Sequence, residues 1–228
     1  SENKITIIEN WVNLPDIIRQ NTVYETLNKY CLLDSNLITF GGVLGHSQDL
    51  TIIINAAKLT ATRTDIVWVI VGDGAQKEYL CNSIEEFQLD NIKLLPMLPR
   101  NEYETILTNS KLGLATLKPV VKTPVVPSKI YSIMASGIPL ICAMESSGDA
   151  PKLVEKIKCG INIPPGDYNK LSESVIRLVD NDNLREELGG NGLNYIKDHP
   201  KAKKRIGSSF GRMQMEEIKN LALAQKTN

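Results

Sequence analysis

The sequence predicts an α/β fold in which a doubly wound parallel sheet carries helices on both faces. Segments with strand and helix patterns alternate through most of the chain, as in parallel sheets with crossover helices. Residues 66–71 form a continuous, mostly β-branched apolar run, which is typical of a strand buried on both faces. Glycine-rich breaks follow two predicted strands, at Gly41-Gly42 and Gly72-Asp73-Gly74. Ligands of such sheets bind at these carboxyl ends of the strands.

The strands are predicted from short apolar or alternating runs that stop at turn residues. The first run stops at Asn10-Trp11, the second at Gly41-Gly42 and the third at Gly72-Asp73-Gly74. In chain order the predicted strands cover residues 4–8, 37–40, 66–71, 92–95, 112–115, 138–142 and 160–163.

The helices are predicted from apolar residues at helical spacing. Leu50, Ile53, Ile54 and Ala57 have that spacing in a helix that begins near Ser47. In chain order the helices are expected from about 47 to 57, after 74 to 87, from 99 or 100 to 109, and over 128–136, 149–156, 168–179, 183–197 and 201–224.

Helix ends are predicted from residues that favour caps. Ser128 is expected to be the N-cap of its helix and Gly137 to end it. Asp149 is expected to cap the next helix, and Asp182 or Asn183 to cap the helix over 183–197.

Composition excludes several classes of protein. The 228 residues include 26 basic and 26 acidic side chains, and the zero net charge argues against a nucleic-acid partner. No apolar run reaches membrane-spanning length. The scattered cysteines form no Cys-x-x-Cys pair, which indicates reduced, buried thiols in a cytoplasmic protein. They are Cys31, Cys81, Cys142 and Cys159.

The loop at residues 41–48 (GGVLGHSQ) joins a predicted strand to a predicted helix. Its glycines allow close approach of a phosphate, but they suit a tight structural turn equally well. The spacing is not the dinucleotide fingerprint. His46 is either a phosphate or proton-transfer group or a structural histidine.

Lys129 lies in the first turn of a predicted helix, where a cation opposes the helix dipole. An anion at that helix end would explain it, because backbone N–H groups and the ammonium would bind the anion together. The alternative is a solvated surface lysine.

Asp180-Asn181-Asp182 has the Asp-x-Asp pattern that binds a metal in one class of sugar transferases. Here it lies between two amphipathic helices and not at the end of a strand. We therefore expect a capping role and no metal site.

Together these segments resemble the C-terminal, nucleotide-sugar-binding domain of GT-B glycosyltransferases of family 4, the glycosyl transferases group 1. The resemblance extends over residues 5–200. Its most specific part is Pro-Ser-Lys-Ile-Tyr at 127–131 with Met-Ala-Ser-Gly-Ile-Pro at 134–139. Weaker matches are the Asn-Trp-Val at 10–12, the glycine loop at 40–48, the strand end at 69–74 and the base-flanking segment at 94–103.

The resemblance implies a Rossmann-like domain, one half of a GT-B fold, that binds a nucleoside diphosphate sugar, with a UDP-sugar expected. No metal or other cofactor is expected, because backbone amides and Lys129 would stabilise the leaving group. The catalytic residues stay unassigned. The resemblance assigns the diphosphate to Gly41, Gly42, Gly45, His46, Gln48, Ser128 and Lys129. It assigns the nucleoside to Gly72, Asp73, Met97, Leu98 and Ser132.

The chain departs from the family pattern at four positions. Pro124 and Ser132 stand where the family often has two glutamates, and the second glutamate normally holds the ribose. Val43 and Gln48 stand where many members carry arginine and lysine. These departures leave a non-catalytic nucleotide-sugar-binding or interaction module as the alternative to a retaining, hexosyltransferase-like enzyme. A related sugar epimerase fits less well, because the Pro-Ser-Lys form favours transferases.

We expect residues 1–200 to form the donor-binding domain and 201–228 a C-terminal helix, with an N-terminal acceptor domain absent from this chain. The isolated chain should then bind nucleotide without transferring sugar. The final helix is expected either to fold back on its own domain or to self-associate through Phe210, Met213, Ile218 and Leu221. The basic cluster at 201–205 is either a solvated helix start or a peripheral contact with the inner face of a membrane. The expected role is polysaccharide or glycoconjugate assembly in the cytoplasm.

Overall fold

A computed structural model describes residues 12, 14–15, 20–122 and 125–198, and it confirms the predicted sheet. Six strands pair in parallel in the order β3-β2-β1-β4-β5-β6. The strands are β1 (Asn36–Gly41), β2 (Ile66–Val71), β3 (Ile92–Leu95), β4 (Leu112–Thr116), β5 (Leu140–Ala143) and β6 (Gly160–Ile163).

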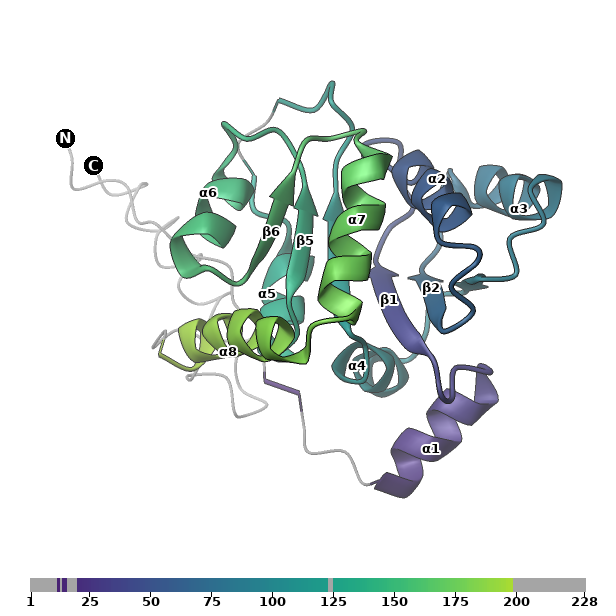
Figure 1. The fold of residues 1–228 in the computed structure, drawn as a ribbon, viewed down its shortest axis with the longest axis horizontal. Coiled ribbons are helices and arrows are strands. Elements are labelled where there is room, and N and C mark those ends of the chain that lie inside the picture. The colour runs from purple at the N-terminus through teal and green to yellow at the C-terminus, as the bar shows by residue number, and fades with distance from the viewer. Residues whose placement is uncertain (1–11, 13, 16–19, 123–124, 199–228) are drawn as a thin grey trace, which may run out of the picture.

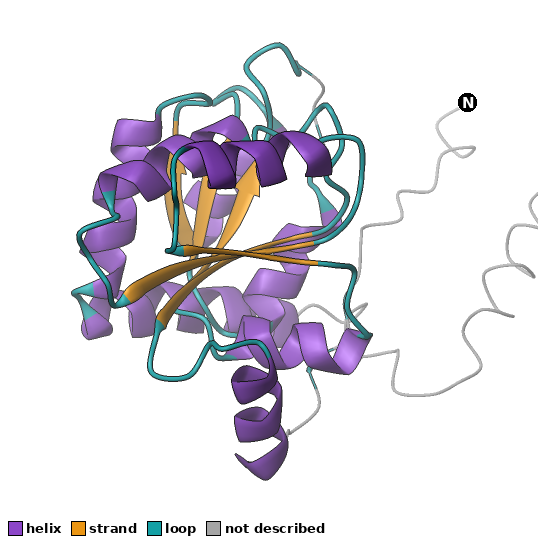
Figure 2. Ribbon diagram, turned by 90° about the vertical axis from the view of Figure 1, so that its right-hand side faces the viewer, coloured by secondary structure: helices purple, strands orange, loops and turns teal. Residues whose placement is uncertain are grey.

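Helices cover both faces of this sheet, and Figure 2 shows the strands between two helical layers. One layer contains α2, α3 and α7, and the other contains α4, α5 and α6. The helices are α1 (Gln20–Lys29), α2 (Thr51–Leu59), α3 (Lys77–Glu86), α4 (Arg100–Thr108), α5 (Ser128–Ala135), α6 (Asp149–Ile157), α7 (Tyr168–Val179) and α8 (Asp182–Asp198).

Strand β2 explains why its sequence is apolar throughout. Trp68 and Ile70 point into the core on the α2 side, whereas Val67, Val69 and Val71 pack on the opposite side. Every residue of the strand is buried. Because successive side chains of a strand alternate between faces, both faces of β2 require apolar residues.

Helix α1 was not predicted, although Val23, Leu27 and Tyr30 have the i, i+4, i+7 spacing of a helix, and Leu27 and Tyr30 pack against the core. Thr26 is its single fully buried residue. The helix lies beside α4 (Figure 1), where Lys29 and Tyr30 bond the Glu102 carboxylate. The predicted strand at 4–8 and the predicted helix at 201–224, with its self-association face, lie outside the described residues.

The start of α2 and the N-cap residues of α5 and α6 differ from the prediction. Helix α2 begins at Thr51 and not near Ser47, because residues 46–48 form a turn closed by a hydrogen bond from Gln48 N to Gly45 O of 3.0 Å. Ser128 is the first residue of α5, and Pro127 occupies its N-cap without a side-chain bond. Asp149 is likewise the first residue of α6, after Gly148 at the N-cap.

The cap of α8 and two of the cysteines also differ from the prediction. The Asn181 side-chain oxygen accepts the Leu184 backbone N–H at 2.9 Å, so Asn181 makes the capping bond expected of Asp182 or Asn183. Cys31 and Cys81 are exposed, whereas Cys142 and Cys159 are buried and free as expected. Burial raises the pKa of the Cys142 thiol to about 12.

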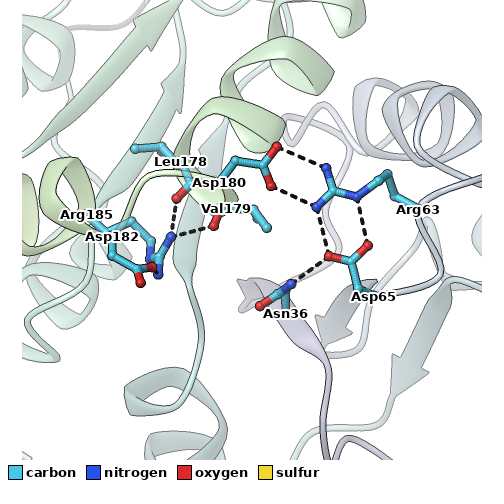
Figure 3. A network of polar contacts seen from close by, with 8 residues as sticks. All are labelled: Asn36, Arg63, Asp65, Leu178, Val179, Asp180, Asp182 and Arg185. Atoms are coloured by element: carbon cyan, nitrogen blue, oxygen red, sulfur yellow. Dashed lines mark hydrogen bonds and ion pairs between the residues drawn. The ribbon is translucent and has the colours of Figure 1, made fainter.

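The Asp-x-Asp segment forms ion pairs (Figure 3). Arg63 donates to Asp65 at 2.8 Å and to Asp180 at 2.9 Å, while Arg185 contacts Asp182. Arg185 also donates to the carbonyl oxygens of the last two residues of α7. The network joins the loop before β2 to the α7–α8 connection, so these carboxylates have a structural role.

Within the described ranges, no helix has the length and apolar character needed to cross a bilayer.

We expect Arg63→Ala to lower the urea midpoint at pH 7. The Arg63 guanidinium holds the pKa of Asp65, and of Asp180, below the ordinary value for an aspartate. A carboxyl group with a depressed folded-state pKa stabilises the fold above its unfolded-state pKa, about 3.9, and this contribution is lost as the pH falls through the folded-state value. The difference from wild type should therefore shrink between about pH 5 and pH 2.

Urea titrations at pH 7, 4 and 2.5 measure this difference. Arg177→Ala removes an exposed arginine from α7 and serves as the control. A difference that stays constant across the pH range would contradict the assigned role of the network.

Candidate functional site

A cavity of about 510 Å³ opens at the carboxyl ends of β1, β2 and β3, beside the first turns of α4 and α5. Its volume suits a small-molecule ligand. The sheet order reverses between β1 and β4, so the cavity lies at the topological switch point. It is lined by Gly41, Gly42, Val43, Gln48, Val71, Met97, Leu98, Arg100, Tyr103, Ser128, Lys129 and Ser132.

The glycine loop after β1 is held against the loop after β2. Gly42 N donates to Val71 O at 2.9 Å, and Leu44 N donates to Asp73 O at 2.8 Å. A Cβ atom on Gly72 would lie 1.9 Å from Gly42 O, and one on Gly74 would lie 2.8 Å from Leu44 O. Glycine is therefore needed after β2 so that the loop after β1 can pack closely enough to form one wall of the cavity.

Lys129 is a half-buried cation whose observed partners are neutral. Its Nζ donates to Gln48 Oε1 at 2.9 Å and lies 3.7 Å from the centroid of the Phe40 ring. Burial lowers the pKa of Lys129 to about 7. No carboxylate is present among the described residues that line the cavity. This arrangement excludes the solvated-lysine alternative and leaves an ammonium that an anionic ligand would neutralise.

The N-terminus of α5 lies in the same wall. The first N–H groups of a helix lack intrahelical acceptors, and the helix dipole is positive at that end. Ser128 and Lys129 are the first two residues of α5, and Lys129 Nζ lies 3.6 Å from the position that a Cβ on Gly42 would occupy. The loop, the helix end and the ammonium therefore lie together in one wall of the cavity, and their donors and positive charge would suit an anion. We call this part of the lining the anion-binding wall.

The other side of the cavity is more apolar. Met97 is 59% exposed and precedes Leu98, while the Tyr103 ring packs over Gly41 so closely that a Cβ there would meet the Tyr103 hydroxyl. Burial raises the pKa of Tyr103 to about 12, so this hydroxyl stays protonated at neutral pH. Arg100 pairs with the Glu104 carboxylate at 2.7 Å. These side chains offer an apolar surface for a flat group, with a hydroxyl and a cation at its edges.

Eight of the twelve predicted site residues line this cavity. They are Gly41, Gly42, Gln48, Ser128, Lys129, Met97, Leu98 and Ser132. The other four are Gly45, His46, Gly72 and Asp73, and none of them lines it. Gly72 faces the backbone of the glycine loop, Asp73 pairs with Lys77 at 2.9 Å, and His46 is exposed.

Arg100 and Tyr103 line the cavity but were not selected from the sequence. Both belong to the segment expected to flank a base, and they lie one helical turn apart in α4. That i, i+3 spacing was the available signal, because it places two side chains on one helix face.

A larger cavity of about 760 Å³ lies beside β6 and α6. Glu145, Glu155 and Glu187 line it together with Lys158. Its acidic lining disfavours an anion, so the smaller, basic cavity is the candidate site.

A protein family and a known protein that match this chain are both described as glycosyltransferases. The family described as "Glycosyl transferases group 1" matches residues 29–195. The "Probable glycosyltransferase WbjE" of Pseudomonas aeruginosa is 26% identical over 151 residues, which are 66% of this chain and 37% of that protein.

Solved structures share the fold at low sequence identity. The Anabaena protein Alr3699/HepE in complex with UDP-glucose aligns with a TM-score of 0.69 at 17% identity, over 89% of this chain and 53% of that one. A glycosyltransferase from Rickettsia africae aligns with a TM-score of 0.73 at 14% identity, over 97% of this chain and 58% of that one. The chain therefore spans only about a third to three fifths of the length of these proteins.

We expect Gly72→Ala to destabilise the fold by about 2–3 kcal/mol, because its methyl group would meet the Gly42 carbonyl oxygen. Gly190→Ala is the control, since a Cβ in this position of α8 meets nothing within 4 Å. Alanine there should stabilise the helix by about 0.5–1 kcal/mol. Chemical denaturation of the three proteins measures both effects, and equal stability of Gly72→Ala and wild type would disprove the close packing.

Proposed function

The chain belongs to the glycosyl transferases group 1 family, and on that basis we propose that it is the donor-binding part of a glycosyltransferase. The donor is a nucleoside diphosphate sugar, with UDP as the expected nucleotide. The observation that carries this proposal is the Lys129 ammonium, which faces the glycine loop with neutral partners around it.

The chemistry needed is stabilisation of a leaving group. When the bond between the sugar and the diphosphate breaks, negative charge builds on the diphosphate oxygens. Lys129, the N–H groups at the start of α5 and the loop amides near Gly42 would face that charge. Because Lys129 is partly withdrawn from water, its interaction with the developing charge is stronger than that of a solvated lysine.

The nucleoside would extend from the diphosphate toward the apolar side of the cavity. Met97, Leu98 and Tyr103 would contact the base, and Ser132 would face the ribose. The Anabaena neighbour was solved with UDP-glucose and shares this fold, which supports UDP as the first nucleotide to test.

The acceptor would be bound by a second domain outside this chain, so we propose that the isolated chain binds donor without transferring sugar. Retention of anomeric configuration, polysaccharide or glycoconjugate assembly and a cytoplasmic location belong to the same proposal, and they rest on the family resemblance.

A non-catalytic nucleotide-sugar-binding module is the second candidate. One observation favours it: Ser132 lines the cavity where the family often has a ribose-binding glutamate. A serine hydroxyl binds a ribose diol more weakly than a carboxylate does. A sugar-transfer assay with the complete protein would separate the two candidates, since both would bind nucleotide and only the enzyme would transfer sugar.

Calorimetry with UDP, GDP and ADP tests the proposal directly. Saturable binding of at least one nucleotide is expected. Absence of heat with all three at millimolar concentration would refute it.

We expect UDP to bind about tenfold or more weakly at pH 9 than at pH 7. The folded-state pKa of Lys129, lowered by burial to about 7, means that the free protein loses its ammonium as the pH rises through this range. Binding of a diphosphate favours the charged amine and so takes up a proton. The terminal phosphate of UDP, with a pKa near 6, stays ionised throughout.

Lys129→Met should remove most of this pH dependence and weaken binding at pH 7. Lys152→Met, a change at an exposed lysine of α6, should leave both unchanged. Titrations of UDP at pH 7, 8 and 9 measure the effect, and wild-type affinity in Lys129→Met would show that the amine does not contact the ligand.

Ser132→Glu should tighten UDP binding about threefold to tenfold, because a carboxylate would accept hydrogen bonds from both ribose hydroxyls. Inorganic pyrophosphate, which lacks a ribose, should bind the variant no better than it binds wild type. Improved binding of both ligands, or of neither, would place the ribose elsewhere.

A further inference from the structure

Gln76 is a buried polar residue that the proposed function has not used. It precedes α3, its residue is only 7% exposed, and it does not line the cavity. A buried amide needs hydrogen-bond partners to offset the loss of water. The partners of the Gln76 side chain both lie in the loop after β1.

The Gln76 side chain closes the second half of the glycine loop. Its Nε2 donates to Gly45 O at 2.5 Å and to Gln48 O at 3.0 Å, so both amide hydrogens are used. Gln48 N also donates to Gly45 O at 3.0 Å. The Gln76 backbone N–H adds a bond of 2.9 Å to Leu44 O. The turn from Gly45 to Gln48 is therefore held from outside by the Gln76 side chain, together with the Lys118 backbone N–H, which donates to Ser47 O at 3.0 Å.

This turn carries the residue that contacts the ammonium. Gln48 Oε1 accepts from Lys129 Nζ at 2.9 Å. The other ionisable side chains of the cavity lining are Arg100, paired with Glu104, and Tyr103, which stays protonated. Gln48 is consequently the polar acceptor on which the position of the Lys129 ammonium depends.

We propose that Gln76 is a positioning residue for the anion-binding wall: its amide holds the Gly45–Gln48 turn in the shape that presents Gln48 to Lys129. The predicted effect of Gln76 on nucleotide binding rests on the proposed function. Its predicted effect on Lys129 in the ligand-free protein does not.

The chemistry of the amide is specific. Glutamate has nearly the same shape, but at neutral pH it offers no donor to the two carbonyl oxygens and adds a negative charge beside them. Leucine fills a similar volume but donates to neither carbonyl oxygen, so Gln48 O loses the Gln76 donor and Gly45 O keeps only the Gln48 N–H. Gln88→Glu makes the same charge change just beyond the other end of α3, at an exposed residue, and is the matched control.

The first measurement uses the ligand-free protein. Labelling the lysine Cε carbons with carbon-13 lets NMR follow the titration of Lys129 in each variant. Loss of the Gln48 acceptor disfavours the ammonium, so the pKa of Lys129 should fall in Gln76→Leu and stay unchanged in Gln88→Glu. An unchanged Lys129 titration in a folded Gln76→Leu protein overturns the proposal.

The second measurement is UDP affinity. Gln76→Leu and Gln76→Glu should each bind UDP about tenfold or more weakly, with Gln88→Glu equal to wild type. Gln76→Glu should recover part of the loss at pH 5, measured relative to wild type at the same pH. A protonated glutamate can again donate to one carbonyl, whereas Gln76→Leu cannot recover.

A double-mutant cycle with Gln48→Ala separates positioning from general destabilisation. If Gln76 acts through Gln48, adding Gln76→Leu to Gln48→Ala should cause no further loss of UDP affinity and no further shift of the Lys129 titration. Losses that add in full overturn the proposal.

Two safeguards keep the outcomes distinct. If Gln76→Leu does not fold, Gln76→Glu, which preserves the shape, provides the same comparisons. If wild type does not bind UDP, the proposed function fails, while the Lys129 titrations still decide the role of Gln76.

Discussion

The ammonium of Lys129, partly withdrawn from water and surrounded by neutral groups, is the constraint on which this site depends. An isolated buried charge is costly, and proteins usually pair it with a carboxylate. Here an aromatic ring and a side-chain amide replace the carboxylate. A carboxylate paired directly with the ammonium would neutralise it. Because neither partner cancels the charge, the ammonium remains available to an anion, and its proton is held less tightly.

Much of the fold could be predicted from the sequence, because it follows from patterns that local geometry enforces. The run from Ile66 to Val71 must be apolar on both faces, so its sequence identified a central strand. The helix predicted over 128–136 is also present, and its apolar residues Ile130, Ile133 and Met134 are buried. Gly137 ends this helix and has a positive φ of 70° just beyond it. The sequence also predicted a cation, Lys129, in the first turn of a helix, and the structure has Lys129 at the start of α5 in the cavity wall.

The parts of the fold and of the site that could not be predicted depend on backbone direction and on contacts between segments distant in sequence. A cap is decided by backbone direction, so Ser128 and Asp149 are good capping residues that nevertheless fall one position inside their helices. Gly72 was expected at the ligand, but it faces the backbone of another loop, and no local pattern distinguishes these two uses of glycine. No sequence pattern indicated the role of Gln76, because the two carbonyl oxygens that its side chain bonds lie 28 and 31 residues earlier in the chain.

The sheet order has a mechanical consequence. The strands β3-β2-β1 and β4-β5-β6 form two halves that are joined in the sheet by β1 and β4 alone, with two paired positions, Ile38 with Leu112 and Thr39 with Gly113. By contrast, β1 pairs with β2 at six positions. The anion-binding wall crosses this narrow seam, since Gln48 belongs to one half and Lys129 to the other. A ligand bound on both sides would therefore add a link across the seam, beside the packing of α2 on α7 and the ion pair between Arg63 and Asp180.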